Sequence, residues 1–575
     1  MERKRTRRKP GNGRLRWVIG GVGAVIVLAL VIFLVQRYTP SKERMALTDY
    51  FVLTEEDQAA VIVDGTYYED EADTPVHGIY QDGHPYLEIS FLKEYLDDGY
   101  VYDGTENILR YITSSHVISV SPGSSTYMVD RSREQADHNI MIARDGAVYL
   151  SLDFMKQYTD LTYSIAEEPC RLIIEKAGYE KTTAALKRDT ELRRHGGVKS
   201  PILKDGKEGD VVSVLDDYGS WSLVLTQDGV LGCVQNSRLG SRQQVVTEAT
   251  LPKEEFSHIL LDTDVVLGWH QVTSASANSG IAEVLSRASG MNVISPTWFY
   301  LDDNQGGIAD LGSRSYVDYC HQQGVQVWGL VSNLENDEVD TTSVLNTTSS
   351  RDALVNNLIA AAITYNLDGI NVDIEQLSGA AADGYLAFVK ELSLKCEKND
   401  LILSVDNYAP SASSMIYNRD VQADFADYVI IMAYDEHYSG GDEAGSVASI
   451  GFVEDAVKAT LEEVPKEQVI MGMPLYSRVW YYDGTTLKSS AMGVAATANY
   501  IADHNMTMTW DEKLGQNYGE YTQDGVTYQL WQEDASSIEE KLKVLTEHDL
   551  AGGAFWKLGF DDASIWSVTA KYLNP

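Results

Sequence analysis

Hydrophobic residues alternate with polar stretches in a regular way through the C-terminal part of the chain, from about residue 256. The hydrophobic runs are short and almost continuous, which is typical of strands buried on both faces. The stretches between them can hold helices, and eight strands alternating with helices predict an α/β fold of the (β/α)8 barrel type. The eight predicted strands are 264–269, 292–298, 325–331, 367–374, 401–405, 428–432, 469–473 and 553–558.

One interval in this pattern is much longer than the others, between residues 481 and 551. It contains a further strand-like run at 526–531, flanked by turn residues. The interval predicts a small α+β insertion at about residues 485–545, beside the end of the barrel that carries active sites.

The fourth predicted strand has a polar face. Successive side chains of a strand point to opposite faces, so Asn371, Asp373 and Glu375 share one face while the other is apolar. A buried charge costs several kcal/mol unless it is paired or neutralised. A solvated edge strand could carry such residues, but the regular apolar alternation favours a buried strand whose acids have a functional role.

Other polar and aromatic residues fall at the C-terminal ends of predicted strands, where barrels of this type carry their active sites. Tyr434 and Asp435 end the sixth strand, Tyr476 and Arg478 follow the seventh, and Trp556 lies on the eighth. Carboxylates do acid–base chemistry and indole rings stack on sugars, so this set favours a carbohydrate substrate.

Several assignments have two interpretations. Trp269 and Trp298 end the first two strands and either line a substrate groove or pack in the core, and Trp480 is similar. Arg478 either contacts sugar hydroxyls or forms a surface ion pair.

Residues 17–35 are uncharged and almost wholly apolar. A helix of this length spans about 28 Å, close to the hydrocarbon thickness of a bilayer. Eight Lys or Arg residues and one Glu lie within residues 1–16, so the positive-inside rule predicts a cytoplasmic tail, a membrane anchor and an extracellular remainder. A cleaved signal peptide is the alternative, but no small-residue cleavage site follows the apolar segment.

A duplicated unit is predicted within residues 41–178. Segment 86–95 repeats as 149–158, with Tyr, Leu, Phe, Lys and Tyr at equal spacing. Short apolar strands at 108–112 and 172–174 follow the two copies, which together predict a repeated strand–helix–strand unit. This α+β module resembles the N-terminal domain of copper amine oxidases, without a visible histidine cluster for copper.

Residues 181–240 have short strands and tight Gly turns and resemble bacterial SH3 domains, which are small β-barrels. Trp221 is expected in the core or rim of this module, with a ligand platform as the alternative. Residues 241–255 are polar and predict a linker to the barrel domain at 256–575.

The net charge of −39 argues against nucleic-acid binding, which needs a basic surface. The eleven histidines are scattered and no metal-ligand spacing occurs, so no metal or other cofactor is expected. Cys320 and Cys396 share the barrel, and the sequence leaves their pairing open.

Four motifs, taken in order, resemble glycoside hydrolase family 18. The segment from Asp368 to Glu375 resembles the family signature Asp-Gly-x-Asp-x-Asp-x-Glu, and residues 432–435 match Met-x-Tyr-Asp. Residues 476–480 resemble Tyr-Gly-Arg-x-Trp, and Trp556 matches the tryptophan of the last strand.

One position departs from the family signature. Asn371 stands where most chitinases have Asp, and bacterial members active on peptidoglycan and spore cortex resemble this chain in that residue. Since Asn371 has no proton to share, Asp373 is expected to stay ionised. Burial and the neighbouring Asp373 are expected to raise the pKa of Glu375.

The resemblance also implies roles for the site residues. Glu375 would donate a proton to the glycosidic oxygen and then act as a base, Asp373 would orient the substrate's acetamido N–H, and Tyr434 would bind its carbonyl. Trp556 would floor the sugar subsite and Asp368 would be structural. Asp435, Tyr476, Arg478 and Trp269 would contact substrate.

The expected protein is thus a membrane-anchored, extracellular β-N-acetylglucosaminidase of the bacterial envelope, retaining and substrate-assisted. Its expected partner is a GlcNAc-containing polysaccharide, peptidoglycan or a related polymer. A chitinase and a non-catalytic wall-binding lectin are the alternatives.

Overall fold

The computed structural model describes residues 13–71 and 74–574, and within these ranges the side chains from Trp17 onward. The basic tail predicted for residues 1–16 lies outside the described side chains. Helix α1 spans Gly13–Tyr38, and its segment Trp17–Tyr38 is long and apolar enough to cross a membrane, a property of length and composition that signal sequences share.

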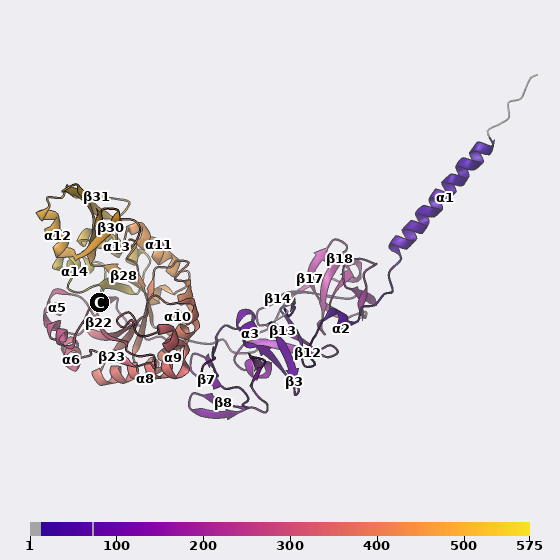
Figure 1. Ribbon diagram of the computed structural model, residues 1–575, viewed down its shortest axis with the longest axis horizontal. Helices are drawn as coiled ribbons and strands as arrows, with labels where there is room; N and C mark the ends of the chain where they lie inside the picture. Colours follow the sequence, from indigo (N-terminus) through magenta and orange to yellow (C-terminus); the bar gives the residue numbers. More distant parts are fainter. Residues whose placement is uncertain (1–12, 72–73, 575) are drawn as a thin grey trace, which may run out of the picture. The chain divides into compact units, whose positions relative to one another are not determined.

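Contacts within the chain group it into two units, whose elements are labelled in Figure 1. Unit 1 comprises the chain up to Asp98 together with Pro122–Thr126 and Gln135–Lys253. Unit 2 comprises Gly99–Ser121, Tyr127–Glu134 and the chain from Glu254 onward.

Unit 2 is built on the predicted barrel. Eight strands pair in parallel, and β21 pairs with both β34 and β22, which closes the ring. All eight predicted strands are confirmed, and β26 runs three residues further than expected. The strands are β21 (Val265–His270), β22 (Val293–Leu301), β24 (Gln326–Ser332), β25 (Gly369–Asp373), β26 (Ile402–Tyr408), β27 (Tyr428–Met432), β28 (Val469–Pro474) and β34 (Gly552–Trp556).

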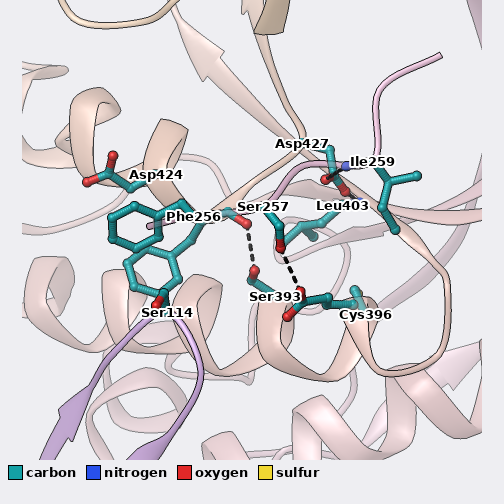
Figure 2. A pocket seen from close by; sticks show the side chains of 11 residues that line it. Ser114, Phe256, Ser257, Ile259, Ser393, Cys396, Leu403, Asp424 and Asp427 are labelled. Carbon is teal, nitrogen blue, oxygen red and sulfur yellow. Dashed lines mark hydrogen bonds between the residues drawn. The ribbon is translucent and has the colours of Figure 1, made fainter. Parts of the chain in front are cut away.

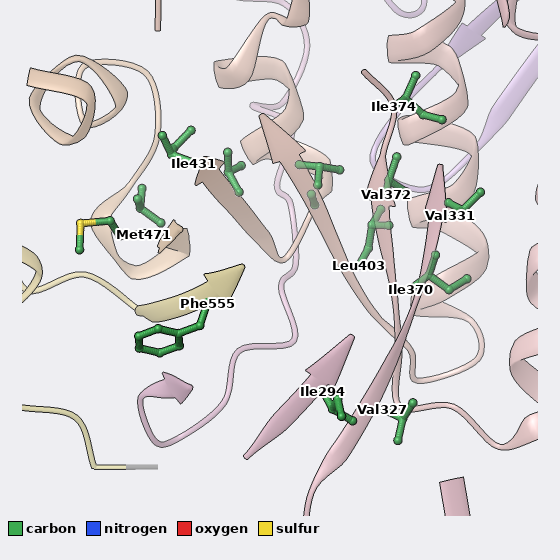
Figure 3. Packing of buried hydrophobic residues seen from close by; sticks show 14 of the residues in the cluster. Ile294, Val327, Val331, Ile370, Val372, Ile374, Leu403, Ile431, Met471 and Phe555 are labelled. Carbon is green, nitrogen blue, oxygen red and sulfur yellow. The ribbon is translucent and has the colours of Figure 1, made fainter. Parts of the chain in front are cut away.

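Two apolar cores hold the barrel together. The outer core lies between strands and helices and includes Ile370, Val372 and Ile374, as Figure 3 shows. The inner core fills the ring and includes Trp328 and Ile430. The helices of the outer layer are α5 (Ile281–Arg287), α6 (Arg314–Gln322), α8 (Thr348–Tyr365), α9 (Ala382–Glu397), α10 (Arg419–Phe425), α11 (Ile450–Thr460), α13 (Ala535–Glu547) and α14 (Ala563–Thr569).

The long interval before the last strand forms a separate sheet with helix α12 (Val494–Asp503). The sheet has the order β30-β29-β33-β32-β31 and starts at Tyr476, before the predicted boundary. Its strands are β29 (Tyr476–Asp483), β30 (Thr486–Gly493), β31 (Thr509–Asp511), β32 (Gln516–Gln523) and β33 (Val526–Gln532).

A fully buried ion pair joins this sheet to the barrel helices. Glu533 follows β33 and Lys541 lies on α13, and each side chain is only 1% exposed. The Lys541 ammonium lies 3.0 Å from both carboxylate oxygens, which also accept hydrogen bonds from Gln516 and Ser537.

An antiparallel sheet from the N-terminal half of the chain packs on the barrel helices. Arg110 on β6 donates to Asp352 of α8 and Glu391 of α9, and Ile112 packs with Leu394 of α9. The predicted strand at 108–112 is therefore not the counterpart of the one at 172–174. This sheet comprises β5 (Tyr100–Asp103), β6 (Ile108–Ile112), β7 (Val117–Val120), β8 (Thr126–Val129) and β9 (Ser132–Gln135).

The N-terminal end of the barrel is covered by residues 256–261. Ile259 donates its backbone N–H to Asp427, and Ser257 donates to Glu397. A hollow of only about 20 Å³ remains there, lined by Phe256 and Cys396 among others (Figure 2). Cys396 and Cys320 are both free thiols.

Unit 1 contains the two copies of the repeat. The strands β4 (His84–Glu88) and β11 (Ala147–Ser151) pair with each other, so that Leu87 faces Leu150, its counterpart 63 residues later. Each strand leads into a short helix, α3 (Ile89–Tyr95) or α4 (Leu152–Met155). A seven-stranded sheet follows, with the order β16-β15-β19-β18-β17-β14-β20. Its strands are β14 (Glu180–Ala185), β15 (Thr190–Arg193), β16 (Ile202–Gly206), β17 (Val211–Tyr218), β18 (Trp221–Thr226), β19 (Leu231–Gln235) and β20 (Gln243–Val246).

One side-chain cluster in unit 1 corrects the expectation of scattered histidines. His84, His138 and Asp153 have ligand-type atoms within 4.8 Å of one another, and the two rings stack at 4.0 Å. Folding brings them together from positions that are distant in the sequence.

Candidate active site

Glu375 directly follows β25, at the C-terminal end of the barrel. Its backbone N–H donates to Asn333 Oδ1 at 2.8 Å, and Asn333 Nδ2 donates back to the Glu375 carbonyl at 3.0 Å. The Tyr408 hydroxyl donates to Glu375 Oε2 at 2.6 Å. These bonds fix both the backbone and the carboxyl group of Glu375.

The pKa of Glu375 is raised from its ordinary value. Burial is the largest cause, and the hydrogen bond from Tyr408 acts in the opposite direction. The carboxylates of Asp435 and Glu335 raise the pKa further. The expected direction is confirmed, so Glu375 can keep a proton at a pH at which ordinary glutamates have lost theirs.

Asp373 corrects the expectation of a permanently ionised carboxylate. Burial raises its pKa well above the ordinary value, and Asp406, Glu375 and Glu335 add like-charge repulsion. Among the described residues, Asp373 Oδ1 has no hydrogen-bond partner. It is therefore a buried acceptor that the described part of the chain leaves without a donor.

Asn371 lies deeper on the same strand face and is fully buried. Its Oδ1 accepts hydrogen bonds from Trp269 Nε1 and Ser295 Oγ, both at 3.0 Å. Its Nδ2 donates to Asp406 Oδ1 at 2.8 Å. Burial is the largest cause that raises the pKa of Asp406, to about 8.

Tyr434 and Asp435 lie at the end of β27, as predicted. The backbone of Gly472 on β28 leaves room for the Tyr434 ring, because a Cβ there would meet Ile431 O at 2.9 Å and Tyr434 Cε1 at 3.3 Å. Burial raises the pKa of Tyr434 well above 10, so its hydroxyl stays a hydrogen-bond donor.

Asp435 gathers two of the other predicted residues. Tyr476 donates to Asp435 Oδ1 at 2.5 Å, and Arg478 Nη2 lies 3.7 Å from the same oxygen. Arg478 thus forms an ion pair, but with a site residue, and Asp435 remains 43% exposed at the rim.

The tryptophans divide into one that is accessible and three that are buried. Trp556 is partly exposed at the end of β34 and packs edge-on against Trp269. Trp269 is 1% exposed, which corrects the expectation that it contacts substrate and makes it a support for Asn371. Trp298 and Trp480 are buried and bond Asn278 and the Gly445 carbonyl, so both belong to the core.

Asp368 has the structural role expected for it. Its Oδ2 accepts the backbone N–H of Val327 at 2.7 Å and lies 2.8 Å from His321 Nε2. It therefore joins β25 to the start of β24 and to α6, away from the C-terminal end of the strands.

The sequence interpretation missed Asp406 and Tyr408. The apolar run of β26 fades after Val405, and the strand was therefore expected to end there. The alternation of side chains nevertheless continues, so that Ser404, Asp406 and Tyr408 share the inner face. Extending that alternation past the apolar run would have found both residues.

Chemically, the site is a partly buried group of acids with tyrosine hydroxyls and one accessible indole. A protonated carboxyl can donate to a leaving group, and a neighbouring carboxylate can bind an amide or stabilise a cation. In the described part of the chain, the three-ligand cluster suited to a metal ion is the one in unit 1.

Comparisons with known proteins agree with this geometry. A family model described as glycosyl hydrolases family 18 matches residues 322–561. The cortical fragment-lytic enzyme of Bacillus subtilis (strain 168) is 28% identical over 266 residues, 44% of this chain and 61% of that protein. The class V chitinase of Lotus japonicus is 23% identical over 258 residues, 39% of this chain and 64% of that protein.

A solved structure shares the fold. The Bacillus cereus spore cortex-lytic enzyme SleL is similar with a TM-score of 0.50 at 18% identity, over 57% of this chain and 77% of that one. The chain spans about three fifths of the length of the first two curated relatives, 62% and 61%. The barrel, which contains the matched residues 322–561, is a domain of glycoside hydrolase family 18.

Proposed function

We propose that this chain is a retaining glycosidase that hydrolyses β-1,4 bonds after GlcNAc in peptidoglycan or a related GlcNAc polymer. The observation that carries the proposal is the position of Glu375. It is a partly buried carboxyl with a raised pKa, at the C-terminal end of a barrel strand and among other acids. Such a group is suited to be a general acid.

In the first step, Glu375 donates its proton to the glycosidic oxygen as the bond to the leaving sugar breaks. The nucleophile is the acetamido oxygen of the bound GlcNAc, which attacks the anomeric carbon and gives a cyclic oxazolinium ion. Glu375, now ionised, takes a proton from water as the water opens that ring, so the configuration is retained.

Asp373 and Tyr434 would hold the acetamido group during these steps. Asp373 Oδ1 can accept the acetamido N–H, and its negative charge stabilises the oxazolinium ion. The buried Tyr434 hydroxyl donates to the attacking oxygen. Trp556 offers its face to the sugar ring, since it is the accessible tryptophan among those predicted.

A bacterial wall glycan is the substrate class that we favour over free chitin. The relative with 28% identity is named a cortical fragment-lytic enzyme, and helix α1 could anchor the catalytic domain on the outer side of a cell membrane. The chitinase relative from Lotus japonicus supports chitin as the second candidate.

The test is digestion of purified peptidoglycan and of chitin oligomers by the full-length protein in detergent, with analysis of the new reducing ends. We expect GlcNAc reducing ends from peptidoglycan. Glu375→Gln should lower kcat by about a thousandfold or more, because the general acid is lost while the shape of the site is kept.

Two controls make this test decisive. Glu547→Gln changes an exposed glutamate at the end of α13, before the last barrel strand begins, and should leave turnover unchanged. Binding of Glu375→Gln to insoluble peptidoglycan should equal that of the wild type. A wild type that binds both polymers but releases no reducing ends would instead indicate a lectin.

A further inference from the structure

Asp406 lies on the inner face of β26, beside the strand that carries the acids. In the register of the two strands, Asn371 faces Ser404 and Val372 faces Val405. One residue beyond the pair of Val372 and Val405, the same register sets Asp373 beside Asp406. Three residues beyond that pair, it sets Glu375 beside Tyr408. The 2.6 Å hydrogen bond from Tyr408 to Glu375 agrees with that continuation.

Hydrogen bonds fix the orientation of the Asn371 amide. Its oxygen is occupied by two donors, Trp269 Nε1 and Ser295 Oγ, so its nitrogen must face an acceptor. That acceptor is Asp406 Oδ1 at 2.8 Å. Asn371 has no carboxyl group, and strand β26 supplies one beside it, that of Asp406.

Asp373 and Asp406, the acid pair, have further acids rather than cations among the described groups that shift their pKa values. The titratable groups that interact with the pair are Glu375 after β25, Glu335 after β24, Tyr385 on α9, Tyr417 before α10 and Tyr434 after β27. Among the described residues, no ion pair or hydrogen bond joins either carboxyl to Arg or Lys. Two ionised carboxylates in this buried place would repel each other strongly.

We propose that Asp373 and Asp406 hold one proton between them, and that Asp406 keeps it when a 2-acetamido sugar binds. Asp406 is then a positioning residue that acts through Asp373. This inference rests on the proposed function for its catalytic consequence, but the shared proton itself does not.

The location of the proton decides what Asp373 can do. With the proton on Asp373, the carboxyl is neutral and stabilises a cation poorly. When the proton moves to Asp406, Asp373 becomes an anion that accepts the acetamido N–H and faces the positive oxazolinium ion. The pair keeps one proton throughout, so no proton is gained or lost by this redistribution.

The first experiment moves the acid from one strand to the other. Asp406→Asn should lower kcat about tenfold or more with little change in KM, and should alter the pH profile of kcat. The double variant Asn371→Asp/Asp406→Asn restores a carboxyl next to Asp373 and should recover most of the loss. Asp427→Asn, a buried acid at the other end of the barrel, should leave the shape of the profile unchanged.

The second experiment detects the proton without activity. In full-length Glu375→Gln protein, infrared difference spectra should show a buried carboxylic acid C=O band that persists above neutral pH. Adding Asp406→Asn should move its loss to lower pH, because Asp373 no longer faces a second carboxylate.

Each result separates the two proposals. A wild type without hydrolytic activity would refute the proposed function, while the infrared titration would still decide the shared proton. The inference is overturned if Asp406→Asn keeps the wild-type kcat and pH profile, if the double variant is no better than Asp406→Asn, or if the infrared titration is unchanged.

Discussion

Two groups of buried acids in unit 2 have opposite electrostatic designs. Glu533 faces the Lys541 ammonium, an amide and a hydroxyl, so its charge is compensated. Asp406 accepts from the Asn371 amide, and Asp373 and Asp406 both face further acids. The comparison teaches that burial alone does not mark a functional acid in this protein. The paired acid joins parts of the fold, and the uncompensated acids lie where chemistry is proposed.

The largest change in stability should come from removing the cation that pairs with Glu533. Lys541→Met leaves Glu533 buried and unpaired, and should lower the free energy of unfolding by about 3–5 kcal/mol. Chemical denaturation measures the change. Lys543→Met, which removes only an exposed pair with Glu540, should change stability by less than about 0.5 kcal/mol. Equal effects of the two substitutions would contradict the contrast.

A smaller change in stability, of opposite sign, is expected when Asp406 of the uncompensated acid pair is replaced. Asp406 has a pKa of about 8 in the folded protein and an ordinary value of 3.8, so its contribution to stability is lost as pH rises between these values. Asp406→Asn removes that loss while its side-chain oxygen can still accept from Asn371. Its Tm should exceed that of the wild type by about 3 °C or more at pH 8, roughly 1 kcal/mol.

The pH dependence is the control for this prediction. The Tm advantage of Asp406→Asn should shrink as pH falls from 8 to 5, because the wild-type carboxyl then holds its proton more fully. A lower Tm than the wild type at pH 8 would show that the carboxyl stabilises the fold, as Glu533 does with its lysine.

The smallest effect concerns Tyr408. Its hydrogen bond lowers the pKa of Glu375 against the effect of burial, so Tyr408→Phe should raise that pKa. The alkaline limb of kcat/KM should therefore move to higher pH, with less than about a tenfold change in the maximum. Tyr438→Phe, which changes an exposed tyrosine, should leave the limb in place. A limb that moves to lower pH would refute this role.

Local pattern determined what could be predicted. The eight strands follow from hydrophobic runs, and the inward direction of Glu375 follows from side-chain alternation. Asp406 was not predicted as a site residue, because it follows Val405, where the apolar run of β26 ends. The role of Trp269 was predicted wrongly, because the sequence does not distinguish a tryptophan that contacts a sugar from one that donates to a buried asparagine.

Long-range contacts could not be predicted. The sheet β5–β9 packs on the barrel through Arg110, which lies more than 240 residues before its partners Asp352 and Glu391. The cluster of His84, His138 and Asp153 likewise depends on the pairing of the two repeat copies. Neither arrangement leaves a periodic signal in the sequence.

The packing of β5–β9 on the barrel also has an evolutionary consequence. A catalytic domain joined by a single linker can be moved between proteins as one continuous piece of gene. Here the barrel's surface at Leu394 and Phe425 is covered by residues encoded before those of the seven-stranded sheet. A gene fragment beginning at residue 256 would encode a barrel with an uncovered apolar face, so the two halves of this gene are expected to be inherited together.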